Sequence, residues 1–186
     1  MSAGLRLTLD EYGRMIEAGA FDALRDRRIE LIHGELREMT PPGPDHSEAV
    51  SRLSAWSIEA RIKNLVKVRT ENPIGIPGLE SAPYPDVAWV KVRTYRDRHP
   101  LPHEVLLLIE VADSSLDSDC GEKAELYAAA GIQDYWVVSL SERLVHVFRK
   151  PQGGSYADHS TAKFGDELRP LAFPQFSLSV SDLLGP

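Results

Sequence analysis

The feature that most constrains the fold is the run Val105–Ala112, which reads VLLLIEVA. A nearly continuous apolar run predicts a strand buried on both faces, and we expect it to span residues 104–112. Glu110 lies inside this run. An ionised carboxylate that loses its hydration in such a strand is costly unless a cation lies beside it. The rest of the sequence should therefore supply that cation.

The flanking segments predict an α/β (α+β) fold with a central mixed sheet flanked by helices, as one domain over residues 1–186. Alternation around His33 and Gly34 predicts a hairpin over residues 28–39. Apolar residues at i, i+3 and i+4 spacing between Ala49 and Ala60 predict an amphipathic helix. Further strands are expected over residues 66–76, 85–91, 135–140 and 143–149, a helix over 122–130, a loop over 151–154, and short strands over 155–161 and 168–171.

Two carboxylates stand at the ends of strands that can be hairpin neighbours. Asp86 lies in the segment YPDVAWV, about two dozen residues before Glu110. Two converging carboxylates are suited to a hard divalent cation such as Mg²⁺, which takes oxygen ligands and keeps several waters. The backbone carbonyl of Val111 would add a third protein oxygen. Asp86 also has a purely structural interpretation, because Pro-Asp is an ordinary turn dipeptide.

Lys123 is the candidate cation from the protein itself. It shares a helix face with Leu126, Tyr127 and Ala130, so its ammonium should point from the buried side of the helix toward the sheet. There it would pair with Glu110 and orient a water or a phosphate oxygen. The bland alternative is a buried Glu–Lys pair that has only a structural role.

His46 is a possible accessory residue at the start of the helix that contains Ala49. The positive end of a helix disfavours a charged imidazole, so we expect His46 to be neutral there and able to donate or accept a hydrogen bond.

The composition excludes several classes of protein. No apolar run approaches the roughly 18–20 residues of a membrane span, and residues 1–10 do not resemble a signal peptide. The only cysteine, Cys120, cannot form an internal disulfide, which fits a cytoplasmic protein. The net charge of −7 argues against a general nucleic-acid coating protein but not against a nuclease.

Two basic clusters stand out against this negative total. Two interpretations of each cluster stay open: it binds phosphate groups, or it is ordinary solvent-exposed surface. They consist of Lys91, Arg93, Arg96 and Arg98, and of Arg61, Lys63, Lys67 and Arg69.

Five segments together resemble the PD-(D/E)XK nuclease superfamily, and more narrowly the bacterial Uma-type restriction endonuclease family. The most specific of them is KAELYAAAGIQDYWVV, residues 123–138. The others are IELIHGEL (29–36), PPGPDH (41–46), PDV (85–87) and IEVADSS (109–115). The resemblance covers nearly the whole chain.

The resemblance implies a restriction-endonuclease-like core and a divalent metal, Mg²⁺ or Mn²⁺, held by Asp86 and Glu110. Glu30 matches the acidic residue that the superfamily often supplies from its N-terminal region. The sequence departs from the pattern at Ala112, where (D/E)XK places lysine; the resemblance moves that lysine to Lys123. The implied reaction is metal-assisted hydrolysis of DNA phosphodiester bonds, with Lys123 orienting the nucleophile or stabilising charge on the phosphate.

Two other functions compete with a DNA endonuclease. One is a catalytically silent binding or regulatory module that keeps the nuclease fold. The other is a structural dimerisation domain, which requires Asp86 to point away from Glu110. A homodimer is expected in any case, because the hairpin over residues 135–149 carries more apolar side chains than one face of a small sheet needs. A protein partner that selects the target would also explain the absence of a DNA-reading motif.

Overall fold

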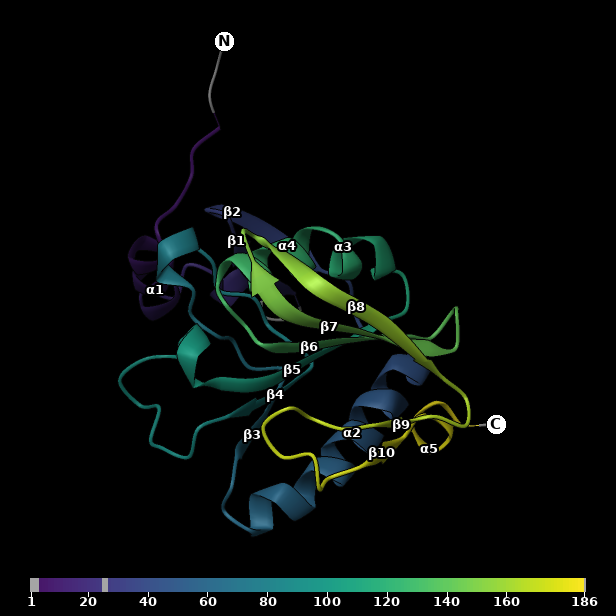
Figure 1. The fold of residues 1–186 in the computed structure, drawn as a ribbon. Coiled ribbons are helices and arrows are strands. Elements are labelled where there is room, and N and C mark those ends of the chain that lie inside the picture. The colour runs from purple at the N-terminus through teal and green to yellow at the C-terminus, as the bar shows by residue number, and fades with distance from the viewer. Residues whose placement is uncertain (1–3, 25–26, 186) are drawn as a thin grey trace.

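The computed structural model describes residues 4–24 and 27–185, and its centre is a six-stranded sheet with the order β3-β4-β5-β6-β7-β8 (Figure 1). β5 and β6 are parallel and every other neighbouring pair is antiparallel. The mixed sheet confirms the expected fold class. Its strands are β3 (Lys67–Thr70), β4 (Val87–Val90), β5 (Val105–Ala112), β6 (Asp134–Ser139), β7 (Leu144–Gln152) and β8 (Ser155–Lys163).

Helix α2 (Pro44–Ile62) covers one face of this sheet together with the C-terminal segment (Figure 1). Leu53 packs with Trp89 and Trp136 in the core on this face. The indole Nε1–H of Trp89 donates to the buried Ser57 hydroxyl at 2.7 Å, which fixes α2 against β4. The C-terminal segment contributes β9 (Glu167–Leu168), β10 (Leu178–Ser179) and α5 (Val180–Leu184).

The opposite face carries α3 (Leu116–Cys120) and α4 (Glu122–Ala129). Tyr127 of α4 packs with Leu108 and Tyr135 in a second core. β5 is therefore buried on both faces, as its apolar sequence predicts. α4 ends before Gly131, whose φ of 81° is in the left-handed region that glycine adopts at low cost.

The N-terminal elements form a separate small layer. α1 (Leu9–Glu17) begins at a capping box between Thr8 and Glu11, and η1 (Asp22–Leu24) follows it. β1 (Arg28–Ile32) and β2 (Glu35–Met39) form the expected hairpin, which lies on the α4 side of the molecule (Figure 1). This hairpin is a two-stranded sheet of its own rather than an extension of the central one.

Two boundaries differ from the sequence-based prediction. The strand expected over 66–76 ends at Thr70, because Pro73 and Pro77 follow and the chain turns through η2 (Pro77–Leu79). The loop expected over 151–154 is only the turn at Gly153 and Gly154, both with positive φ, between two nine-residue strands. η3 (Pro102–Glu104) precedes β5.

The apolar residues of the β6–β7 hairpin are buried within the chain itself. Trp136, Val138 and Val145 are fully covered, and Val147 and Phe148 nearly so. The surplus of apolar surface that suggested a homodimer is thus absorbed by the monomer's two cores, and the dimer stays a prediction. Over residues 4–24 and 27–185, no helix is both long and apolar enough to cross a membrane.

Candidate active site

The register of β4 and β5 brings the first two candidate carboxylates together. Val87 pairs with Ile109, so Asp86 and Glu110 lie opposite each other, just where β4 begins. Since no β4 residue continues the ladder beyond this point, the N–H of Val111 donates instead to Asp86 Oδ2 at 2.7 Å. A strand residue directs its N–H and C=O to the same side, so the Val111 carbonyl also faces Asp86.

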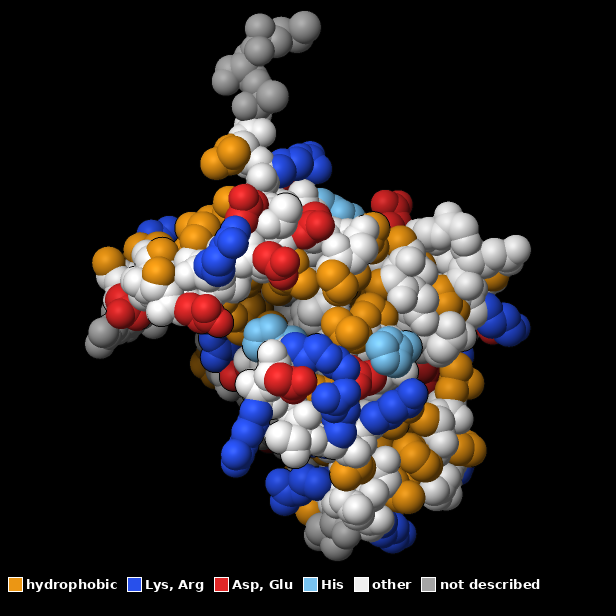
Figure 2. Space-filling model, turned by 90° about the vertical axis from the view of Figure 1, so that its left-hand side faces the viewer, with side chains coloured by type: hydrophobic (Ala, Val, Ile, Leu, Met, Phe, Trp, Pro, Cys, Tyr) orange, Lys and Arg blue, Asp and Glu red, His pale blue; other side chains and the backbone are white. Residues whose placement is uncertain are grey.

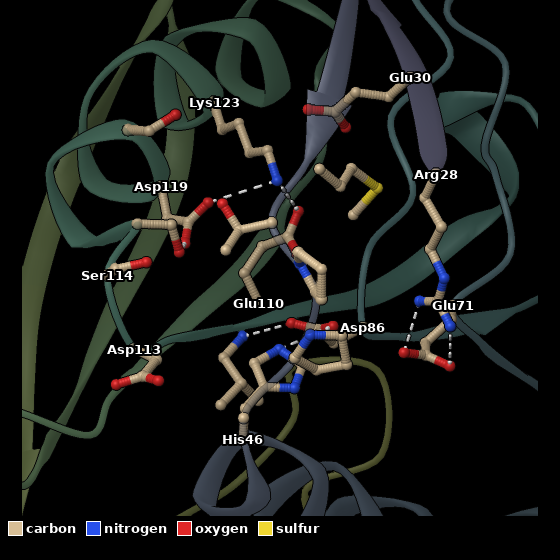
Figure 3. A pocket seen from close by; sticks show the side chains of 18 of the residues that line it. Arg28, Glu30, His46, Glu71, Asp86, Glu110, Asp113, Ser114, Asp119 and Lys123 are labelled. Carbon is tan, nitrogen blue, oxygen red and sulfur yellow. Dashed lines mark hydrogen bonds and ion pairs between the residues drawn. The ribbon is translucent and has the colours of Figure 1, made fainter. Parts of the chain in front are cut away.

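All the candidate residues line one cavity of about 270 Å³, in which Figure 3 shows the labelled side chains converging from separate elements. β1 supplies Glu30, the first turn of α2 supplies His46, and α4 supplies Lys123. The prediction that sequence-distant residues share a site is therefore matched by the geometry. The residues concerned are Glu30, His46, Asp86, Glu110, Val111 and Lys123.

Glu110 is almost completely buried, with 3% of its surface exposed. Its Oε1 accepts hydrogen bonds from the Tyr127 hydroxyl at 2.7 Å and from Lys123 Nζ at 3.2 Å. Burial nevertheless raises the pKa of Glu110 to about 8, because desolvation and the nearby charges of Asp119 and Asp86 outweigh the lysine. Lys123 is thus the cation that the sequence led us to expect beside Glu110, but its charge offsets only part of the cost of burying the Glu110 carboxylate.

Lys123 lies between two carboxylates, because its Nζ is also 3.3 Å from Asp119 Oδ1 (Figure 3). Burial lowers the pKa of Lys123, but the surrounding carboxylates, Glu110 foremost, outweigh this and hold the pKa well above its ordinary value. The ammonium therefore stays charged at neutral pH. Asp119 is itself buried and accepts a hydrogen bond from the Ser115 hydroxyl at 2.5 Å.

The pKa of His46 shifts in the direction opposite to the one expected from the helix N-terminus. The imidazole Nε2 lies 3.2 Å from Asp86 Oδ1, and this contact raises the pKa of His46 despite burial. The carboxylate outweighs the helix N-terminus because it carries a full charge at hydrogen-bond distance. Both Asp86 oxygens are therefore engaged, one by His46 and the other by the Val111 N–H.

Glu30 is buried, and its Oε2 has no hydrogen-bond partner among the residues that the structure describes. The hairpin that carries it is fixed at both strands: Arg28 of β1 pairs with Glu71 at 2.6 Å, and Arg37 of β2 forms a bidentate pair with Glu122 of α4. These pairs hold Glu30 across the cavity from Lys123 (Figure 3), whose pKa it also raises.

Asp119 and Tyr127 are the site residues that the sequence reasoning missed. They lie four residues before and four residues after Lys123, so all three share one side of the α3–α4 segment. The i, i+4 spacing was a usable signal for both. What it did not reveal is that Tyr127 donates to the same Glu110 oxygen as the lysine.

The donor set fits a hard cation in its chemistry. Four buried carboxylates, those of Glu30, Asp86, Glu110 and Asp119, line the cavity. Its cationic side chains are Lys123, His46, Arg28 and Arg37, and the two arginines pair with other carboxylates, those of Glu71 and Glu122. Within the described residues, no three acidic, histidine or cysteine side chains are close enough to hold a metal by themselves. Mg²⁺ does not need three, since it binds through one or two carboxylates and retains water. The unpartnered Glu30 oxygen and the raised pKa of Glu110 both indicate missing positive charge.

The fold is shared with a protein of known structure. A crystal structure described as a "putative nuclease" of DUF820 from Anabaena variabilis ATCC 29413 has a TM-score of 0.74 at 17% identity, covering 96% of this chain and 97% of that one. At this identity the likeness establishes the fold. No curated protein matches the chain.

Residues 9–181 match the model of the Uma2 family, which is described as "Putative restriction endonuclease". The chain belongs to this family. The purely structural dimerisation hypothesis fails its own test, because Asp86 does not point away from Glu110: both line one cavity and the charge of Asp86 raises the pKa of Glu110.

Proposed function

We propose that the chain is a divalent-metal-dependent endonuclease that hydrolyses DNA phosphodiester bonds. The observation that carries the proposal is the buried, under-compensated carboxylate set around Lys123. A protein core does not keep such a set without a use, because each desolvated charge costs stability. Perturbed carboxylates in a cavity mark candidate catalytic sites, and membership of a restriction endonuclease family supports this class of reaction.

Asp86 and Glu110 are the proposed ligands of Mg²⁺ or Mn²⁺, together with the Val111 carbonyl. Glu110 has its Oε1 occupied by Tyr127 and Lys123, which leaves Oε2 as the oxygen for the metal. A bound divalent ion would supply Lewis-acid polarisation of the scissile phosphate and lower the pKa of a coordinated water.

Lys123 has the role of positioning and charge stabilisation. Its ammonium stays protonated, lies within the cavity, and is held on two sides by Glu110 and Asp119. From there it would orient the attacking water or donate to a phosphate oxygen as negative charge develops. Glu30 lies opposite as a further acidic residue of the site, and His46 holds Asp86 through Oδ1.

The test is cleavage of supercoiled plasmid and of single-stranded DNA with Mg²⁺, with Mn²⁺ and with EDTA. Wild type, Glu110→Ala and Glu125→Ala are compared; Glu125 is an exposed glutamate of α4, the helix that carries Lys123. We expect metal-dependent nicking that Glu110→Ala abolishes and Glu125→Ala retains. Equal cleavage by all three proteins, or none by any with no calorimetric binding of Mg²⁺ or Mn²⁺, would refute the proposal.

One observation favours the silent binding module as the second candidate. Asp86 already uses both oxygens in hydrogen bonds within the protein, so a metal must share them. A silent module is supported if the wild type binds metal and DNA but cuts neither substrate. A homodimer, and a protein partner that selects the target, are further proposals about the assembly.

A further inference from the structure

The first basic cluster of the sequence meets Lys67 and Arg69 of the second cluster on one surface. Arg61 and Lys63, the other two members of the second cluster, lie at the end of α2. Three side chains of the two clusters surround the Tyr95 ring, with Lys67 Nζ 5.4 Å, Arg69 Cζ 5.9 Å and Arg93 Cζ 5.3 Å from its centroid. Figure 2, which looks onto the side where the long loop after β4 projects, shows a concentration of Lys and Arg side chains. We define the basic patch as Lys67, Arg69, Lys91, Arg93, Arg96 and Arg98.

The loop that carries most of the patch is held in shape by one buried carboxylate. Glu104 accepts hydrogen bonds from Arg98 at 2.6 Å, from Arg93 at 3.0 Å and from the Leu101 N–H at 2.8 Å. The Arg98 guanidinium beside it contributes most to lowering the pKa of Glu104, to about 2. The loop is thus pre-organised, and a ligand would not need to order it.

The remaining cations of the patch are not neutralised. Arg69 is half-buried, its Nε is enclosed without a hydrogen-bond partner, and it forms no ion pair with any described residue. Burial lowers the pKa of Arg69, with no carboxylate to offset it. Lys67 is exposed and donates only to the Arg93 carbonyl, at 3.4 Å. A desolvated cation without a counter-ion favours an anionic ligand.

The patch and the candidate active site share one face of the sheet. Arg69 pairs with Ala88 and Lys67 with Val90, and cross-strand partners project from the same face. Asp86 is two residues before Ala88, so it projects from that face too. At about 3.3 Å per residue, Arg69 and Lys67 lie roughly 7 and 13 Å along the strands from Asp86.

Ile74 and Ile76 belong to the same buried core as Ala88 and Val90, which project from this face. A single small anion cannot reach both the patch and the cavity over their separation along the strands. An extended polyanion can, and roughly 7 and 13 Å correspond to about two and four steps of a DNA strand at about 3.4 Å per step.

We propose that the basic patch binds the phosphate backbone of the DNA a few nucleotides from the scissile bond. This inference rests on the proposed function, since it takes DNA as the substrate. Contacts to phosphate oxygens carry no sequence information directly, so they would add affinity without sequence preference. The competing explanation is that the cations protect the exposed edge of β3 from pairing with another strand.

The test is binding of a fluorescein-labelled DNA duplex in EDTA, followed by anisotropy between about 50 and 200 mM KCl. The patch variants are Lys67→Gln/Arg69→Gln and, because Arg69 is half-buried, the exposed pair Lys91→Gln/Arg96→Gln. Lys150→Gln/Lys163→Gln on β7 and β8 makes the same change in net charge far from the patch. We expect each patch variant to weaken binding roughly tenfold and to reduce the salt slope by about 2, and the control to do neither.

The outcomes separate the patch from catalysis. Equal affinities for wild type, patch variants and control would overturn the patch proposal and leave nuclease activity to the plasmid assay. Self-association of the patch variants with unchanged DNA affinity would overturn it in favour of edge protection. Patch-dependent binding by a protein that cuts nothing would support the patch while the catalytic proposal fails.

Discussion

At the scale of single residues, the molecule is organised around a carboxylate in an unfavourable place. Glu110 is buried in a strand, and its two donors share one oxygen. Lysine and tyrosine together do not restore an ordinary pKa. The buried carboxylate therefore carries an energetic cost, which the proposed divalent cation would offset.

This cost should be visible as pH-dependent stability. The folded pKa of Glu110 is about 8 against an ordinary 4.5, so the folded state holds this proton more tightly and stability falls as pH rises from 4.5 to 8. In EDTA, the Tm of Glu110→Gln should be near that of the wild type at pH 4.5. At pH 8 the variant should be more stable, by on the order of 1 kcal/mol in the free energy of unfolding, which corresponds to a Tm higher by roughly 2–4 °C. Calorimetry at both pH values measures this; a variant less stable than wild type at pH 8 would contradict it.

Tyr127 should act by positioning Glu110. Tyr127→Phe removes one of two hydrogen bonds to Oε1 and should cost about 1–2 kcal/mol of stability. If the nuclease proposal holds, kcat should fall while KM for DNA is unchanged, because the patch is intact. Tyr156→Phe is the matched control, since the buried Tyr156 hydroxyl has no hydrogen-bond partner in the described part of the chain. Equal effects of the two changes would exclude the positioning role.

At the scale of elements, the sequence predicted those helices and strands whose positions depend on local sequence pattern. β5, the amphipathic α2 and the β1–β2 hairpin all appear where periodicity and turn residues indicated. The short β3 and the small C-terminal elements were missed or misjudged, because prolines and tertiary contacts decide them rather than periodicity. That the hairpin forms its own sheet is likewise a consequence of packing, not of its sequence.

The hairpin is attached to α4 by the Arg37–Glu122 pair. Arg37→Ala should loosen β1 and with it Glu30, giving faster amide hydrogen exchange over Arg28–Ile32. Global stability should change by no more than about 1 kcal/mol, because the pair is partly exposed. Arg27→Ala is the control: Arg27 pairs with Glu38 within the hairpin itself. Exchange that is unchanged in Arg37→Ala, or equally faster in Arg27→Ala, would show that α4 does not restrain the hairpin.

At the scale of the whole molecule, negative and positive side chains gather in different places. The chain carries −7 overall, yet its cavity gathers carboxylates and its basic patch gathers cations. Residue types and helical spacing suggested Asp86, Glu110 and Lys123 as site residues, and the family resemblance suggested Glu30. Which oxygens are occupied, the direction in which the pKa of His46 shifts and the roles of Asp119 and Tyr127 depend on atomic geometry, which no sequence pattern encodes.

Metal binding should stabilise the entire fold through this site. A cation that binds only the folded state adds about 2.7 kcal/mol at 100 times its Kd. Mg²⁺ or Mn²⁺ should therefore raise the wild-type Tm, and Asp86→Asn should lose most of that rise. Asp97→Asn, an exposed aspartate in the basic loop, should keep it. Equal metal-induced shifts in both variants would place the binding elsewhere.

The lysine on α4 has a consequence for how such sites are recognised. Ala112, which stands where the superfamily pattern has lysine, is completely enclosed by the second core, so that strand position offers no room for a long side chain. A pattern search that demands lysine two residues after the glutamate would pass over this chain. A template that specifies only where an ammonium must lie in space, without the element that delivers it, would find it and any relatives built in the same way.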